Sequence, residues 1–223
     1  MALILIIGNK NYSSWSLRPW LVLKQSGLEF EEVRIPLDLP DTTEQISAYS
    51  PSGRVPALQH DGLTLWESLA ICEYIAELAP DRHLWPAEAA ARAVARAVSA
   101  EMHSGFSSLR SQMPVDCRAR RPQTATPAVQ RDIDRICNLW QTCRQNFGGT
   151  GDFLFSSFSI ADAMYAPVAT RFVTYAVPLP PIAQAYVDAL WQLPAMQEWL
   201  AAAAAETEVI DTDQDAFRDR NSD

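Results

Sequence analysis

The stretch from Ser50 to Ala76, SPSGRVPALQHDGLTLWESLAICEYIA, decides the fold of the first half of the chain. Its Ser, Pro and Gly residues favour a turn, after which Arg54–Pro56 leads into a short apolar run. Asp61–Gly62 is typical of a tight hairpin between two strands. Beyond Glu67–Ser68, apolar residues recur at the spacing of one helix face. The stretch therefore predicts a loop, a strand, a tight turn, a second strand and a helix.

An acid and a hydroxyl, Glu67 and Ser68, stand at the start of that predicted helix. A helix N-terminus carries unpaired backbone N–H groups and the positive end of the helix dipole. It can therefore hold a small anionic or zwitterionic ligand. Both residue types also favour a helix start for structural reasons alone, so the residues by themselves leave both interpretations open.

The combination of R-V-P-A-L with E-S-x-A-I-x-x-Y-I about ten residues later resembles the glutathione-binding half of soluble glutathione transferases. The resemblance implies that the bond before Pro56 is cis and that the Val55 backbone pairs with the cysteinyl part of glutathione. It implies that Glu67 and Ser68 hold the γ-glutamyl end. Arg54 corresponds to a basic glutathione contact of tau-type members, with a solvated loop arginine as the equal alternative.

The whole chain has 223 residues, 48% of them hydrophobic and 20% charged, which is ordinary for a globular protein. Its net charge of −9 argues against a nucleic-acid partner. No apolar run approaches the roughly 20 residues that a membrane-spanning helix needs. The four cysteines form no C-x-x-C pair and the three histidines are scattered. We therefore expect a cytoplasmic protein without a metal site, with the histidines structural or exposed.

The first 80 residues alternate between strand and helix patterns. Leu3–Ile7 is a continuous apolar run typical of a buried strand, and a helical pattern follows from Trp15 to Gly27 with Pro19 in its first turn. Phe30–Ile35 reads as a second strand, and a short helix is expected near 43–48. With the Ser50–Ala76 stretch, the order is β-α-β-α-β-β-α. This order predicts an α/β thioredoxin-like domain over residues 1–80.

The second part of the chain is predicted to be all helix. A linker at 81–86 precedes an all-α domain at 87–210, and an acidic tail covers 211–223, with fraying expected from Glu206 onward. The predicted helices run over 87–113, 129–147, 159–177, 181–190 and 194–205. The S-I-A-D box at 159–162 matches a helix-capping box and resembles the folding motif of the same transferase family. It extends the resemblance to nearly the full chain.

The loop YSSWSLR at 12–18 lies where a thioredoxin-like order places the reactive group, and without C-x-x-C it is no disulfide oxidoreductase. It resembles the S-S-C-x-x-R loop of zeta-type transferases and the S-P-F-x-x-R loop of tau-type ones. The resemblance indicates a bacterial, serine-type member in which Ser13 faces the glutathione sulfur, with Ser14 as the alternative. Either serine can instead cap the helix, and Ser14 is expected there. Trp15 replaces the zeta cysteine, and Arg18 is expected in a buried ion pair.

The second substrate is expected in a cleft beside this loop. By position in the family, the cleft is lined by Trp15, Glu101, Phe106 and Arg110, with an ordinary helix face as the alternative for the last three. The remaining tryptophans are expected in the core: Trp66, Trp85, Trp140, Trp191 and Trp199.

These features together predict a cytosolic glutathione transferase. Glutathione is its co-substrate, its second substrate is a small apolar electrophile, and the family resemblance implies a homodimer. One alternative is a glutathione-dependent isomerase of the maleylacetoacetate type, which Trp15 weakens. Another is a non-catalytic binding or interaction protein on the same fold. Retention of Ser13, Val55, Pro56, Glu67 and Ser68 together argues against that second alternative.

Overall fold

The first half of the chain has the predicted order β-α-β-α-β-β-α in the computed structural model, which describes residues 2–210. The elements are β1 (Leu3–Ile7), α1 (Ser14–Ser26), β2 (Phe30–Arg34), α2 (Thr42–Ser47), β3 (Ala57–His60), β4 (Leu63–Trp66) and α3 (Ser68–Leu78). The strands form one sheet in the order β2-β1-β3-β4, in which β1 runs parallel to β2 and antiparallel to β3. The predicted thioredoxin-like fold of this half is confirmed.

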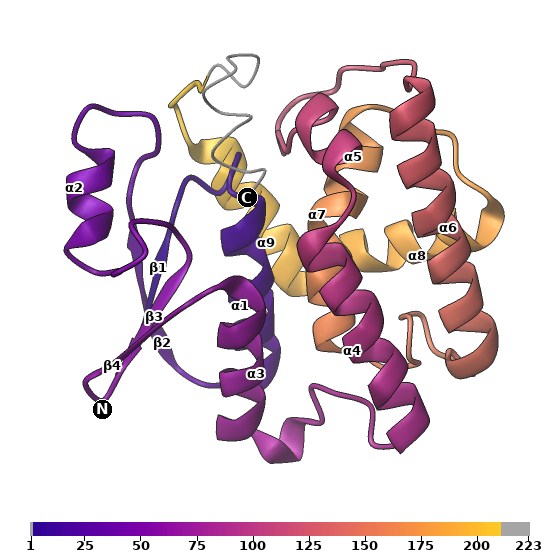
Figure 1. Cartoon of the computed structure of the whole chain (residues 1–223), viewed down its shortest axis with the longest axis horizontal. Coiled ribbons are helices and arrows are strands. Elements are labelled where there is room, and N and C mark those ends of the chain that lie inside the picture. The colour runs from indigo at the N-terminus through magenta and orange to yellow at the C-terminus, as the bar shows by residue number, and fades with distance from the viewer. Residues whose placement is uncertain (1, 211–223) are drawn as a thin grey trace.

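The central strand β1 separates two hydrophobic cores. Successive side chains of a strand point to opposite faces, so Leu3, Leu5 and Ile7 pack into the large core with α1 and α3. Ile6 instead packs with Ile46 of α2 on the other face. Figure 1 shows the result: α1 and α3 lie between the sheet and the helical half, and α2 covers the outer face.

The hairpin between β3 and β4 forms as the sequence predicts. Asp61 and Gly62 have φ angles of 51° and 81°, so both central residues of the turn are left-handed. A two-residue turn of this kind matches the twist of the strands that it joins. The Val55–Pro56 peptide bond just before β3 is cis, also as predicted.

The second half of the chain is entirely helical. After the 3-10 turn η1 (Pro80–Arg82), it contains α4 (Ala89–Ser104), α5 (Ser107–Gln112), α6 (Pro127–Phe147), α7 (Ile160–Thr174), α8 (Pro181–Gln192) and α9 (Pro194–Ala205). Helix α7 is buried along almost its whole length and packs on both α1 and α4. It therefore joins the helical half to the sheet half. Within residues 2–210, no helix is both long and apolar enough to cross a bilayer.

The predicted capping box begins α7. Ser159 and Asp162 exchange the two side-chain to backbone hydrogen bonds that define the box. The buried Asp162 carboxylate also accepts hydrogen bonds from the Leu154 N–H, at 3.1 Å, and from the Tyr186 hydroxyl, at 2.9 Å. One carboxylate thus anchors the start of α7, the preceding connection and α8, and the prediction of this box is confirmed.

The long helix predicted over 87–113 is wrong, because it breaks at Gly105–Phe106. Gly105 is extended and Phe106 is left-handed, with φ 61°. A Cβ atom on Gly105 would lie 2.7 Å from the Glu101 carbonyl oxygen, so the chain passes too close to α4 for another residue type. Arg110 donates to the carbonyls of His103 and Gly105, which the break leaves without helical partners.

The prediction that the chain frays from Glu206 is also wrong. The Glu206 carboxylate accepts the backbone N–H groups of Lys10 and Asn11, at 2.7 and 3.0 Å. Arg118 donates to the carbonyl oxygens of Glu206 and Glu208. The end of α9 is therefore fastened to the loop after β1. The predicted acidic tail at 211–223 lies outside the described residues.

The tryptophan predictions hold for three of the five side chains. Trp85, Trp140 and Trp199 are buried, and Trp191 is partly buried. Trp66 was expected in the core but is 45% exposed. It ends β4, which is an edge strand of the sheet and is exposed or half-buried along its length.

Candidate active site

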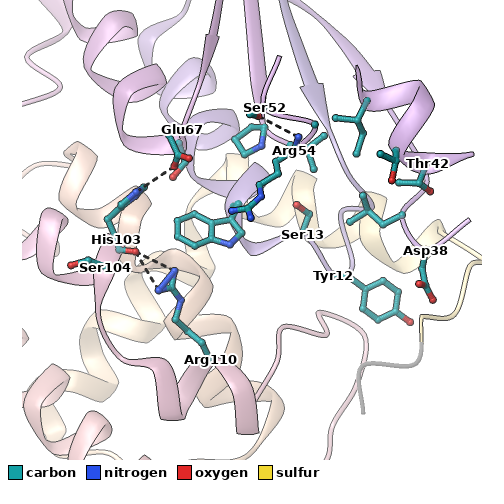
Figure 2. Close-up of a pocket in the computed structure, with 18 residues that line it drawn as sticks. Tyr12, Ser13, Asp38, Thr42, Ser52, Arg54, Glu67, His103, Ser104 and Arg110 are labelled. Atoms are coloured by element: carbon teal, nitrogen blue, oxygen red, sulfur yellow. Dashed lines mark hydrogen bonds and ion pairs between the residues drawn. The ribbon is translucent and has the colours of Figure 1, made fainter. Parts of the chain in front are cut away.

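A cavity of about 440 Å³ lies where the two halves meet (Figure 2). We call its two sides the sheet-side wall, from residues between Tyr12 and Ser68, and the helix-side wall, formed by His103, Ser104 and Arg110. The sheet-side wall consists of Tyr12, Ser13, Trp15, Leu37, Asp38, Thr42, Thr43, Ile46, Ser52, Gly53, Arg54, Val55, Pro56, Glu67 and Ser68.

The two candidate serines have different positions. Ser13 lines the cavity, whereas Ser14 is the first residue of α1 and is not among the lining residues. The expected N-cap at Ser14 is wrong: Ser13 is the N-cap, and its Oγ accepts the Ser16 N–H at 3.3 Å. The reason is a turn in which Asn9 O accepts the Ser13 N–H at 2.8 Å, which brings the helix start one residue forward.

Pro19 lies in the interior of α1 and not in the predicted first turn, which corrects that prediction. There the missing N–H removes one helical hydrogen bond. A further contact fixes the start of the helix. The Ser13 and Ser16 hydroxyl oxygens are 2.7 Å apart, and Ser16 Oγ accepts the Gly8 N–H at 3.1 Å. Both serines are buried, so the end of β1 and the start of α1 are joined through hydroxyl groups.

Trp15 lies among cationic side chains. The guanidinium carbons of Arg18 and Arg110 are 4.1 and 4.4 Å from the centroid of its ring. The His103 ring meets it edge-on, at 5.2 Å. Cation–π contacts of this kind stabilise a cation that is withdrawn from water.

The expected ion pair of Arg18 is wrong. In the described part of the chain Arg18 has no carboxylate partner, and its Nε and Nη1 atoms are buried without a hydrogen bond. Burial, and then the like charges of Arg110 and Arg171, hold its pKa well below the usual range. The stacking on Trp15 takes the place of the ion pair, so the guanidinium groups of Arg18 and Arg110 meet at the Trp15 ring.

The residues predicted to hold glutathione lie together on the sheet-side wall: Arg54, Val55, Pro56, Glu67 and Ser68. Glu67 has a left-handed backbone, with φ 70°, immediately before α3. The Ser68 hydroxyl is buried in this wall and has no hydrogen-bond partner. A buried, unpaired hydroxyl at a helix N-terminus is a suitable donor for a ligand carboxylate.

His103 is a cavity residue that the sequence interpretation had placed as structural or exposed. Its Nε2 atom is 3.4 Å from the Glu67 carboxylate, a contact that joins the two walls (Figure 2). Burial and the positive charge of Arg18 lower the His103 pKa, while Glu67 raises it. The available sequence signal was its position two residues before Gly105, at the end of a helix that faces the loop.

Two residues predicted for the second-substrate cleft do not line the cavity. Glu101 is held by Arg135 of α6 through two hydrogen bonds of 2.8 and 2.9 Å. Phe106 is 8% exposed and packs in the large core. Glu101 thus faces α6 from within α4, whereas the left-handed Phe106 turns into the core at the break after α4. Trp15 and Arg110 do line it.

The described residues offer neither a metal site nor an activated thiol. Among residues 2–210, no group of three His, Cys, Asp or Glu side chains is placed to hold a metal ion. The four cysteines are buried and unpaired. Burial raises the pKa of Cys137 and Cys143 to about 11 and that of Cys117 to about 12. These thiols therefore stay protonated at neutral pH and do not provide a thiolate nucleophile. The cavity lining holds hydroxyl groups, including that of Ser13, and no cysteine.

Comparison with known proteins gives the family. Residues 12–78 match the glutathione S-transferase N-terminal domain and residues 118–202 match the C-terminal domain. A maleylacetoacetate isomerase of Rattus norvegicus is 32% identical over 175 residues, covering 75% of this chain and 77% of the relative. The chain therefore belongs to the glutathione S-transferase family.

Solved structures agree with this assignment. A glutathione transferase homologue from Burkholderia, with bound glutathione, superposes with a TM-score of 0.71 at 28% identity, over 92% of this chain and 100% of that one. Among sequence relatives, glutathione S-transferase F13 of Arabidopsis thaliana is 29% identical over 167 residues, covering 70% of this chain and 74% of the relative. The thioredoxin-like domain followed by a helical domain is thus the fold of this family.

Proposed function

We propose that this protein is a glutathione transferase that stabilises the glutathione thiolate with the Ser13 hydroxyl. The observation that carries the proposal is the grouping of Ser13, Glu67 and the unpaired Ser68 hydroxyl in one cavity. The Burkholderia homologue with bound glutathione supports it. The serine-type assignment rests on Ser13 and on the protonated state of the buried thiols.

The proposed binding mode follows from charge. The γ-glutamyl end of glutathione carries an ammonium group and a carboxylate. The Glu67 carboxylate suits the ammonium, and the Ser68 hydroxyl with the first N–H groups of α3 suits the carboxylate. The Val55 backbone is assigned to the cysteinyl part, and Arg54 to the glycyl carboxylate.

The proposed chemistry is attack by sulfur on carbon. A free thiol has a pKa of about 8.5, so only a few per cent is thiolate at pH 7. A hydrogen bond from Ser13 Oγ, together with the positive end of α1, favours the anion. The thiolate electron pair forms the S–C bond, and the leaving group departs with the electrons of the bond that breaks. The electrophile is assigned to the space beside Trp15 and Arg110.

A glutathione-dependent cis–trans isomerase is the second candidate. The name of the Rattus relative supports it, and so do Arg110 and His103, which give the helix-side wall donors for an acidic substrate. Trp15, at the position of the zeta cysteine, weighs against it. Mixing the protein and glutathione with either maleylacetoacetate or a panel of apolar electrophiles separates the two candidates by the substrate that is consumed.

A homodimer is proposed as the assembly. The edge strand β4 exposes Leu63 and Trp66, which are 44% and 45% accessible in the single chain. Large apolar side chains at a sheet edge are suited to a subunit contact. Light scattering after size exclusion should give twice the mass of the chain. A monomer at micromolar concentration would remove the dimer from the proposal.

Isothermal titration calorimetry with glutathione tests the function itself. We expect one site per chain, and turnover of at least one electrophile of the panel. Glutathione binding without any turnover would leave the non-catalytic binding protein as the better description. No binding at millimolar glutathione would overturn the proposed function.

A further inference from the structure

Ser16 is a buried hydroxyl that the proposed chemistry leaves without a role. It lies in the first turn of α1, is 0% exposed, and does not line the cavity. Its Oγ atom is 2.7 Å from Ser13 Oγ and accepts the Gly8 N–H at 3.1 Å. Ser16 thus stands between the end of β1 and the hydroxyl that is proposed to face sulfur.

The direction of the bond between the two hydroxyls follows from counting protons. Ser16 Oγ carries one proton, and among the described residues Ser13 Oγ is the acceptor within its reach. If Ser13 donated instead, the Ser16 proton would be buried without a partner, which is costly. Ser13 Oγ also accepts the Ser16 N–H at 3.3 Å, so its acceptor side faces Ser16. The arrangement in which Ser16 donates is therefore the favoured one.

We propose that Ser16 is a positioning residue that directs the proton of Ser13 into the cavity. Since the Ser13 acceptor side is occupied by Ser16, its own proton is left for a partner on the cavity side, where Ser13 lines the cavity. The inference rests on the proposed function, in which that partner is the glutathione thiolate.

The three groups form a chain of donors that ends at sulfur. The Gly8 N–H polarises the Ser16 hydroxyl, which polarises the Ser13 hydroxyl in the same sense. Such chains strengthen each member by roughly 10–30% in a buried site. Because Gly8 directly follows β1, the chain also fixes the distance between the sheet and the hydroxyl that acts on sulfur.

The test is the pKa of glutathione bound to the parent protein, to Ser13→Ala, to Ser16→Ala and to the double variant, followed by thiolate absorbance at roughly 240 nm. Ser13→Ala should raise that pKa the most, toward the value of free glutathione. Ser16→Ala should raise it by about a tenth to a third of the Ser13→Ala shift, and the affinity for glutathione should change less than twofold. In the double variant, Ser16→Ala should add nothing to Ser13→Ala, because its effect acts through that hydroxyl.

Ser26→Ala is the matched control on the same helix. Ser26 is buried, and its Oγ accepts the Leu28 N–H at 3.1 Å. This hydrogen bond matches the one in which Ser16 Oγ accepts the Gly8 N–H. It should lower the melting temperature without moving the thiolate pKa. If Ser16→Ala does not fold, Ser16→Cys fills the same space with a weak donor and carries the test.

The outcomes separate the two proposals. If Ser13→Ala leaves the pKa of bound glutathione unchanged, the proposed role of Ser13 fails, and that of Ser16 with it. If Ser13→Ala shifts the pKa but neither Ser16 variant does, Ser16 has only a structural role and this inference alone is overturned. An additive double variant has the same meaning, since a second shift would show that Ser16 does not act through Ser13.

Discussion

The two walls of the cavity are built in different ways. The sheet-side wall draws its polar groups from short, contiguous motifs: Ser13 before α1, Val55–Pro56 before β3, and Glu67–Ser68 before α3. The helix-side wall draws His103 and Arg110 from either side of a broken helix. Hydroxyl and carboxylate groups are common on the first wall, whereas Arg110 and the imidazole of His103 mark the second. In the proposed function, the sheet-side wall binds glutathione, and Arg110 of the helix-side wall meets the second substrate together with Trp15.

The largest expected effect comes from removing support for the helix-side wall without touching the cavity. Asp162→Ala leaves the Leu154 N–H, the Tyr186 hydroxyl and the capping groups of Ser159 without their acceptor. We expect a loss of about 3–5 kcal/mol in the free energy of unfolding. Denaturant unfolding measures it. Asp188→Ala, at an exposed acid of α8, should stay within about 0.5 kcal/mol. Equal losses would mean that the box does not anchor α7.

The next largest effect should be confined to the sheet-side wall. Glu67→Ala should weaken glutathione binding by about 1.5–3 kcal/mol, the value of a hydrogen bond to a charged group. Calorimetry measures the dissociation constant. Glu77→Ala removes the same charge from an exposed position of α3 and should leave affinity unchanged. An unchanged affinity in a folded Glu67→Ala protein would remove Glu67 from the binding site.

A smaller effect should be confined to the helix-side wall. Arg110→Ala leaves the His103 and Gly105 carbonyls unpaired and should lower the free energy of unfolding by about 1–3 kcal/mol. It should also raise KM for the electrophile while the dissociation constant of glutathione stays the same. Steady-state kinetics at saturating glutathione measures KM for the electrophile, and calorimetry measures the dissociation constant of glutathione. Weaker glutathione binding would break the division between the walls.

The control for Arg110 is Arg135→Ala, which removes an exposed ion pair with Glu101 outside the cavity. Its cost should be about 0–1 kcal/mol, with KM unchanged. An Arg135 variant that altered KM as much as Arg110→Ala would place the effect in α4 as a whole rather than in the cavity.

The smallest expected effect is the pH dependence of the contact between the walls. His103 has a lowered pKa in the folded protein, because burial and Arg18 oppose its charged form more than Glu67 favours it. As pH falls below about 6.5, the unfolded chain therefore binds a proton at His103 before the folded protein does. Proton binding favours the unfolded chain, so the free energy of unfolding falls toward acid pH. Denaturant unfolding should show a loss between pH 7.5 and 5 that is smaller in His103→Gln. A variant with the same slope as the parent would contradict this.

The sequence predicts best what is local. The Asp61–Gly62 hairpin, the Ser159–Asp162 box and the Glu67–Ser68 helix start each lie within a few residues, so spacing is sufficient to identify them. His103 and Glu67 are 36 positions apart, and their contact depends on how α4 packs against the start of α3. For His103 the sequence offers only its position shortly before Gly105, and no local motif marks it as a cavity residue.

The same limit explains two wrong predictions in the first helix. Arg18 was expected to be held by a buried ion pair, but its partner is the ring of Trp15, three residues earlier. The N-cap depends on the turn at Asn9, which sets the first helical residue. Both outcomes follow from packing against α7 and the loop, which residue types alone do not specify.

The fastening of Glu206 to the loop after β1 has a practical consequence for cleavage of the chain. A protease that removed the chain after Ala205 would strip two backbone N–H groups, at Lys10 and Asn11, of their acceptor. Arg118, which also donates to the Tyr12 hydroxyl in the cavity, would lose its carbonyl partners at the same time. The segment that follows α9 thus acts as a tether on the loop that carries Ser13. Cleavage after Ala205 should reduce the proposed turnover before the fold is lost.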